Sequence, residues 1–152
     1  ETTELQFSSM QAINIRRIEA GIPDSGSDFN MEMNPFEAGL DRFIDMRKGQ
    51  FIGRKSLLTA SRKKKLYGVL STRFGPKQGD VIMDNTGVII GRVTTGVQSP
   101  QLSAGIGYVN CHDGGDYTNK KMMLKNQRGE EAECSVMKTP FYDKEKRIPR
   151  KL

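Results

Sequence analysis

The sequence predicts an α+β fold that is mainly β, with short helices followed by a six-stranded, antiparallel, jelly-roll-like barrel at the C-terminal end. Two observations lead to this prediction. Up to about residue 60, apolar residues recur at helical spacing and Gly or Pro ends each run. From Leu66 onward, six short runs of β-forming residues alternate with turn sequences, a number that can close a small barrel. We therefore expect short helices in residues 1–60 and the barrel in residues 61–152.

Residues 1–20 are expected to form the first helix. Met10 and Ile13 keep helical spacing, and Ser9 can cap the start because its hydroxyl accepts a hydrogen bond from a free backbone N–H. Gly21 supplies the left-handed conformation that often ends a helix. The link that follows is rich in turn residues.

A second helix is expected to start at Asn34 and Pro35, a capping residue followed by a first-turn proline. Glu37 lies where a carboxylate favours the positive end of the helix dipole. This helix is expected to cover residues 35–40. It should pass into a loosely alternating stretch, residues 42–46, of the kind found at a sheet edge.

A further short helix is expected over residues 53–60, ending in the basic run 62–65. Cations are favourable at that end of a helix dipole. As a nucleic-acid patch the run is weak, because no aromatic residues are interleaved with it for base stacking and Tyr67 is the one neighbouring ring.

The six candidate strands are separated by turn sequences that contain Gly, Asn, Asp or Pro. They are residues 66–71, 80–83, 88–95, 104–110, 121–126 and 130–137. The run from His112 to Asp116 is interpreted as a hairpin turn and not as a metal or triad site, because neighbours in sequence point in different directions. The tail, residues 143–152, is expected to be irregular.

Four glycines in the barrel region do not form a phosphate-binding loop, because the required order of strand, glycine turn and helix is absent. They are expected to let strands bend or pass close to one another. These residues are Gly91, Gly96, Gly105 and Gly107.

The formal net charge of +6 is compatible with an anionic ligand, nucleic acid or an acidic membrane surface. A basic solvated surface is the simpler interpretation, and nucleic acid is not favoured as a partner. No apolar run approaches the length needed to cross a bilayer, so no membrane partner is expected. Cys111 and Cys134 do not have the spacing of a metal site and are expected to be free, buried thiols in a reducing compartment.

Six short motifs also occur in a fixed order along the chain. They are RIEAG (17–21), NPFEAGL (34–40), FIGRKSL (51–57), GRVTTG (91–96) followed by SP (99–100), IGYV (106–109) and KTPFY (138–142). This series resembles the T-protein family of the glycine cleavage system, the tetrahydrofolate-dependent aminomethyltransferases, together with the folate modules of dimethylglycine and sarcosine dehydrogenases. Six motifs in the family's order make a chance resemblance improbable.

The resemblance implies that the chain is the C-terminal part of a one-carbon transferase with tetrahydrofolate as cofactor. Residues 1–60 would hold the end of the folate-binding domain and linker helices, and residues 61–152 the C-terminal aminomethyltransferase barrel. The implied partners are folate, an aminomethyl or methyl donor such as a lipoyl carrier protein, and a missing N-terminal part of the same polypeptide. The family's catalytic aspartate belongs to that missing part, so this chain alone is expected to be inactive. The implied location is the cytoplasm, or the mitochondrial matrix in a eukaryote.

Arg17 is the first candidate site residue. A guanidinium offers a planar fork of donors that suits a carboxylate, and a helix end can present it to a pocket. From the residues alone, structural pairing with Glu19 or Glu37 is the favoured role, whereas the resemblance implies that Arg17 is a folate ligand. Glu37 is the second folate-binding candidate, and it can also cap its own helix or orient Arg17. No catalytic residue and no metal ligand are assigned.

Two alternatives stay open. The run Asp41 to Met46 resembles a motif of dimethylsulfoniopropionate demethylases, so a folate-dependent demethylase or methyltransferase acting on dimethylglycine, sarcosine or dimethylsulfoniopropionate is the nearest one. From a different class, the basic barrel could bind nucleic acid or a protein partner. A steep salt dependence of polynucleotide affinity would support nucleic-acid binding.

Overall fold

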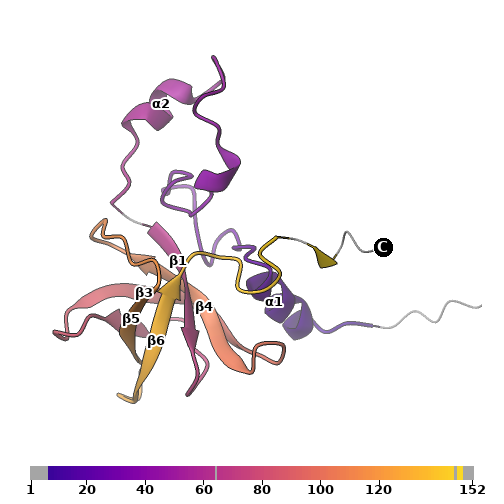
Figure 1. Ribbon diagram of the computed structural model, residues 1–152, viewed down its shortest axis with the longest axis vertical. Helices are drawn as coiled ribbons and strands as arrows, with labels where there is room; N and C mark the ends of the chain where they lie inside the picture. The colour runs from indigo at the N-terminus through magenta and orange to yellow at the C-terminus, as the bar shows by residue number, and fades with distance from the viewer. Residues whose placement is uncertain (1–6, 64, 146, 149–152) are drawn as a thin grey trace, which may run out of the picture.

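The computed structural model describes residues 7–63, 65–145 and 147–148. A helix, a 3₁₀ turn and a short second helix precede six strands. Their bounds are α1 Met10–Glu19, η1 Asp41–Phe43, α2 Arg54–Thr59, β1 Lys65–Ser71, β2 Val81–Met83, β3 Ile89–Ser99, β4 Ala104–Cys111, β5 Lys120–Lys125 and β6 Glu131–Met137. Figure 1 shows α1 lying against the side of the strands and α2 on an arm that extends away from them.

The six strands form a closed antiparallel barrel in the order β1-β4-β3-β2-β5-β6. This confirms the predicted barrel, and the strand bounds lie close to those expected from sequence. The main difference is β3, which continues to Ser99, past its predicted end at Thr95. Because β1 pairs with both β4 and β6, the barrel has no open edge at its first strand.

Side chains alternate between two apolar clusters, as the two-residue period of a strand requires. One cluster fills the barrel with residues from all six strands, such as Val69, Val109 and Val136, which are fully buried. The other lies between the barrel wall and α1. Its members are Ile18, Leu66, Ile106, Tyr108 and Phe141. The second cluster fixes α1 against β3 and β4.

At the barrel glycines, other segments of the backbone come so close that a side chain would not fit, as predicted. A Cβ atom on Gly96 would lie 2.2 Å from the carbonyl oxygen of Pro76, and one on Gly107 would lie 2.3 Å from the carbonyl oxygen of Thr95. Real Cβ atoms do not come this close to backbone oxygen. The segment containing Pro76 therefore passes across β3 at a distance that only glycine permits.

Helix α1 has the predicted caps at both ends. Ser9 Oγ accepts a hydrogen bond from the Ala12 N–H at 3.1 Å. At the other end Gly21 has a φ of 71°, and the N–H groups of Gly21 and Ile22 donate to the carbonyls of Ile18 and Arg17. The predicted helix is correct for residues 10–19 but wrong for residues 7–9, which precede it. Residues 1–6 lie outside the described part of the chain.

Three details of the predicted secondary structure are corrected. Residues 35–39 form a capped turn and not a helix. Residues 42–46 form the end of η1 and a turn, and they contain no strand. The β4–β5 connection, which contains His112 to Asp116, is not a hairpin turn, because β4 and β5 do not pair. This turn-rich segment therefore connects two strands that are not neighbours in the barrel.

Helix α2 confirms the helix predicted at residues 53–60, but it ends at Thr59, before the basic run. Arg62 lies in the following loop and Lys65 begins β1, while Lys64 is outside the described residues. No α2 residue is buried, and large apolar side chains on this arm are exposed, among them Phe43, Ile52 and Leu58. In the described ranges, no helix has the length and apolar character needed to cross a membrane.

Candidate functional site

Arg17 lies in the last turn of α1, where its guanidinium is oriented by three acceptors. Its Nε donates to Asn14 Oδ1 at 2.8 Å, and its Nη1 donates to Asp28 Oδ2 at 2.8 Å and to the Ile22 carbonyl at 3.2 Å. The charge partner of Arg17 is therefore Asp28, and not Glu19 or Glu37. The side chain of Arg17 keeps 18% of its surface exposed, whereas that of Asp28 keeps none.

Asp28 is the centre of a polar cluster that joins α1, the following loop and the barrel. Besides Arg17, its Oδ2 accepts a hydrogen bond from the Asp24 N–H at 2.8 Å. Its Oδ1 accepts hydrogen bonds from the hydroxyls of Thr94 and Thr95 at 2.7 and 2.6 Å. A buried carboxylate with four donors is fully compensated, which is what permits its burial.

A β-bulge brings both threonines to the same carboxylate oxygen. Successive side chains of a regular strand point to opposite faces, so Thr94 and Thr95 would normally diverge. The pairing of β3 with β4 shifts register between Val93 and Thr95, leaving Thr94 as the extra residue. A bulge of this kind redirects one side chain. The link between Asp28 and the barrel thus depends on an irregularity that the sequence does not reveal.

The hydroxyl of Tyr108 lies buried beside this cluster without a hydrogen-bond partner among the described residues. Burial raises the pKa of Tyr108 far above its usual value, and the nearby Asp28 carboxylate adds to the increase. Tyr108 therefore remains a neutral donor close to the charges of Asp28 and Arg17.

Glu37, the second predicted site residue, is buried and stabilises its own turn. Its Oε2 accepts a hydrogen bond from the Asn34 N–H at 3.1 Å, and Asn34 Oδ1 accepts in return from the N–H groups of Phe36 and Glu37. This reciprocal arrangement is a capping box. Glu37 makes no hydrogen bond or ion pair with Arg17, so the structure does not bring the two predicted site residues together.

Glu19 connects α1 to the barrel at a different point. Its side chain is 3% exposed, and it accepts hydrogen bonds from Ser99 Oγ at 2.6 Å and from Arg16 Nη1 at 2.9 Å. Its backbone carbonyl also accepts from the N–H groups of Phe141 and Tyr142. The RIEAG motif is therefore an attachment point as well as a helix end.

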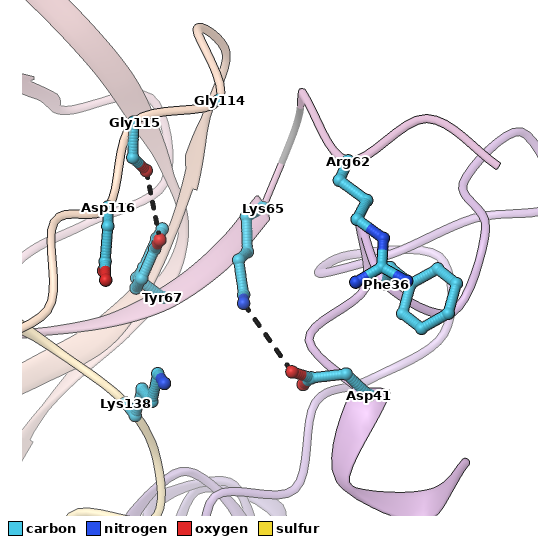
Figure 2. A pocket seen from close by; sticks show the side chains of 9 residues that line it. All are labelled: Phe36, Asp41, Arg62, Lys65, Tyr67, Gly114, Gly115, Asp116 and Lys138. Carbon is cyan, nitrogen blue, oxygen red and sulfur yellow. Dashed lines mark hydrogen bonds and ion pairs between the residues drawn. The ribbon is translucent and has the colours of Figure 1, made fainter. Parts of the chain in front are cut away.

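A basic groove lies between β1, the turn after Asn34 and the segment after β6 (Figure 2). It consists of two adjoining hollows of about 220 and 210 Å³ that share Asp41, Lys65 and Lys138. Arg62 and Lys65 of the basic run 62–65, which the sequence predicts to be a helix end, line the first hollow.

The two cysteines are free and buried, as predicted. Burial raises the pKa of each thiol to about 12. Within the described ranges, no group of three or more His, Cys, Asp or Glu side chains is arranged to hold a metal ion.

The family model for the glycine cleavage T-protein C-terminal barrel domain matches residues 64–143, more than half of the chain. The chain belongs to this family. The match covers all six strands of the barrel, so the motif resemblance and the observed fold agree on the same region.

Several curated relatives extend the similarity to the N-terminal segment. An aminomethyltransferase of Koribacter versatilis is 33% identical over 140 residues, which cover 88% of this chain and 36% of the relative. A probable aminomethyltransferase of Halobacterium salinarum is 34% identical over 147 residues, covering 92% of this chain and 39% of the relative. The chain thus spans well under half the length of these relatives.

A solved structure has the same fold. The crystal structure of glycine cleavage system aminomethyltransferase T from Bartonella henselae superposes with a TM-score of 0.73 at 24% identity, covering 88% of this chain and 38% of that chain. Because the superposed part includes most of this chain, the packing of residues before the barrel is shared as well as the barrel itself.

Proposed function

We propose that this chain is the C-terminal part of a tetrahydrofolate-dependent aminomethyltransferase and that it contributes to folate anchoring. The observation that carries the proposal is the match of the T-protein C-terminal barrel model to residues 64–143. The proposal divides the chain into the end of a folate-binding domain with linker helices, residues 1–60, and the barrel domain, residues 61–152. An aminomethyl or methyl donor, with a lipoyl carrier as one candidate, is part of the same proposal.

Arg17 is the proposed folate ligand, and its surroundings fit that role. Asn14 and Asp28 hold Nε and Nη1, while Nη2 makes no hydrogen bond with a described residue. A guanidinium fixed on two edges presents its remaining N–H group in one direction, with little entropy left to lose. A carboxylate, such as the one on the glutamate end of folate, is a matching acceptor.

The neighbouring groups would support this contact without making it. Asp28 orients Arg17, and the buried hydroxyl of Tyr108 offers a further donor in the same region. Glu37 would act by holding the turn that begins at Asn34. When bound, tetrahydrofolate supplies the nucleophilic nitrogen that accepts the one-carbon unit, and this chain's residues bind and orient it.

The proposal is tested by calorimetric titration of tetrahydrofolate into the full-length gene product that carries this chain. Arg17→Lys keeps a cation beside Asp28 but removes the planar fork. We expect a loss of about 1.5–3 kcal/mol of binding free energy, the usual contribution of a hydrogen bond to a charged group. Arg47→Ala is the matched control, because Arg47 is exposed and pairs only with Asp45.

Thermal unfolding of each variant separates loss of a ligand contact from loss of the fold. If the Arg17→Lys protein is folded and its folate affinity is undiminished, Arg17 is not a folate ligand. If the parent protein does not bind folate at all, the proposed function itself is wrong.

A further inference from the structure

The basic groove has a surplus of positive charge that its own carboxylates do not neutralise. Its cations are Arg62, Lys65 and Lys138 in the first hollow and Arg42 in the second, against the two carboxylates Asp41 and Asp116. Four cations therefore face two anions. Concave surfaces lined by one excess sign of charge concentrate ligands of the opposite sign.

The ion pairs within the groove leave much of its positive charge available to a ligand. Lys65 Nζ lies 3.7 Å from Asp41 Oδ2, too far for a hydrogen bond. Lys138 and Arg62 make no ion pair with any described residue. Asp116 Oδ1 accepts hydrogen bonds from the N–H and the hydroxyl of Thr118. These bonds lower the pKa of Asp116, and the nearby charges of Lys138 and Lys65 add a smaller contribution. Asp116 is thus already hydrogen-bonded to Thr118, and Asp41 is only loosely paired with Lys65.

Two aromatic residues, Phe36 and Tyr67, lie beside the first hollow. The Arg62 guanidinium lies 4.0 Å from the ring centroid of Phe36, which holds this cation at the mouth of the hollow (Figure 2). On the opposite side the Tyr67 hydroxyl donates to the Gly115 carbonyl at 3.2 Å, so this ring is fixed too. These two contacts fix Arg62 and Tyr67 on opposite sides of the hollow.

Two of the cations, Lys65 and Lys138, lie at the ends of barrel strands. Lys65 begins β1 and Lys138 directly follows β6, and these two strands pair with each other in the barrel wall. Figure 2 shows the Lys65 and Lys138 side chains bordering the same open space from neighbouring strands. A hollow of about 220 Å³ holds an anion of several heavy atoms, since one liquid water takes up about 30 Å³.

We propose that the basic groove binds a small anion carrying carboxylate or phosphate groups, held by Lys138, Lys65 and Arg62. The site is separate from the Arg17 cluster, since Arg17 lines neither hollow. The proposal therefore does not depend on folate binding.

The test is a pair of calorimetric titrations of the full-length gene product at low ionic strength, one with pyrophosphate and one with citrate. We expect one of the two to bind at a single saturable site, and the preferred probe identifies phosphate or carboxylate as the recognised group. Lys138→Ala should weaken that binding by about tenfold or more, as expected for loss of a charge-assisted contact. Lys138 is exposed, so its replacement does not disturb the fold.

Two further variants are expected to change anion affinity differently from Lys138→Ala. Asp41→Asn removes the carboxylate that competes for Lys65, so it should tighten anion binding, a result that damage to the fold cannot produce. Lys55→Ala is the matched control: Lys55 lies exposed on α2 and lines neither hollow, so binding should be unchanged. Arg17→Lys should also leave anion binding unchanged while weakening folate, which separates this proposal from the proposed function.

Three outcomes would overturn the proposal. The first is the absence of saturable binding by either probe. The second is equal weakening by Lys138→Ala and Lys55→Ala, which would indicate general surface charge. The third is tighter binding by an oligonucleotide than by either small anion, with the same dependence on Lys138, which would make the groove part of a nucleic-acid surface.

Discussion

The barrel and the segment that precedes it are held together in different ways. Each barrel strand is hydrogen-bonded to two neighbours, and the apolar interior draws residues from all six. Residues 7–63 contain short helices and turns, and they are attached to the barrel by one apolar cluster around Ile18 and by a few polar contacts. The polar side-chain contacts include those of Glu19 with Ser99 and of Asp28 with Thr94 and Thr95. Stability in the barrel is therefore spread over many contacts, whereas attachment of the segment rests on a few.

Removing the central carboxylate should have the largest effect. Asp28→Ala removes the charge partner of Arg17 and the acceptor that two half-buried hydroxyls share, and breaking a buried ion pair costs about 3–5 kcal/mol. Because Arg17 keeps 18% of its surface exposed, we expect the lower part of this range. The free energy of unfolding by urea measures it.

Asp24→Ala is the control: among the described residues the Asp24 side chain accepts a hydrogen bond from Ser27 alone, and its backbone N–H remains for Asp28. A cost for Asp28→Ala similar to that of the control would show that the segment is held mainly by the apolar cluster around Ile18.

A single added methyl group should disturb the barrel somewhat less. Gly96→Ala places a Cβ 2.2 Å from the Pro76 carbonyl oxygen, so the crossing segment must move, and overpacking of this kind costs about 1–3 kcal/mol. Gly49→Ala is the matched control, since no atom lies within 4 Å of its Cβ position. If both variants unfold at the same urea concentration, the close crossing is not a constraint on the barrel.

The last effect is a pH dependence that belongs to the barrel interior and is absent at neutral pH. Burial raises the pKa of Cys111 and Cys134 to about 12, from an unfolded value of 9.0. The stability linked to each neutral thiol is fully present below pH 9 and is lost as the pH rises toward 12. Above pH 9 the expected loss is about 1.4 kcal/mol per thiol for each pH unit.

Urea unfolding at a series of pH values from neutral to alkaline measures this loss. The Cys111→Ala/Cys134→Ala double variant supplies the comparison, because it retains all lysines and tyrosines that titrate in the same range. A stability curve that falls equally steeply without the thiols would assign the alkaline loss to those other groups.

Prediction from sequence succeeded where the deciding interactions are local. Ser9 caps α1 and Gly21 ends it, because a cap depends on residues within one turn. The strands of the barrel follow from runs of β-forming residues between turns, and the ordered motifs identified the family. The residues 42–46, whose weak alternation indicated a strand, had no partner strand to pair with and form turns.

The candidate sites were only partly predictable. The role of Arg17 as a folate ligand stays a prediction. The expected pairing of Arg17 with Glu19 or Glu37 was wrong, and its actual partner Asp28 was missed, because a carboxylate in a turn-rich link shows no local pattern that indicates burial. The basic run was interpreted as a helix end. In the structure Arg62 lies over Phe36 and Lys65 begins a strand beside Lys138, an arrangement that joins residues far apart in sequence.

The sequence by itself determined the helix ends, the strands, the places where only glycine fits and the family, because each depends on neighbouring residues or on their order. The tertiary structure alone decided which charges meet. Closure of the barrel brings β1 beside β6, and the β3 bulge turns two consecutive threonines toward one buried carboxylate. Contacts of this kind form between distant parts of the chain, and they are set by how the strands pair and not by any local pattern.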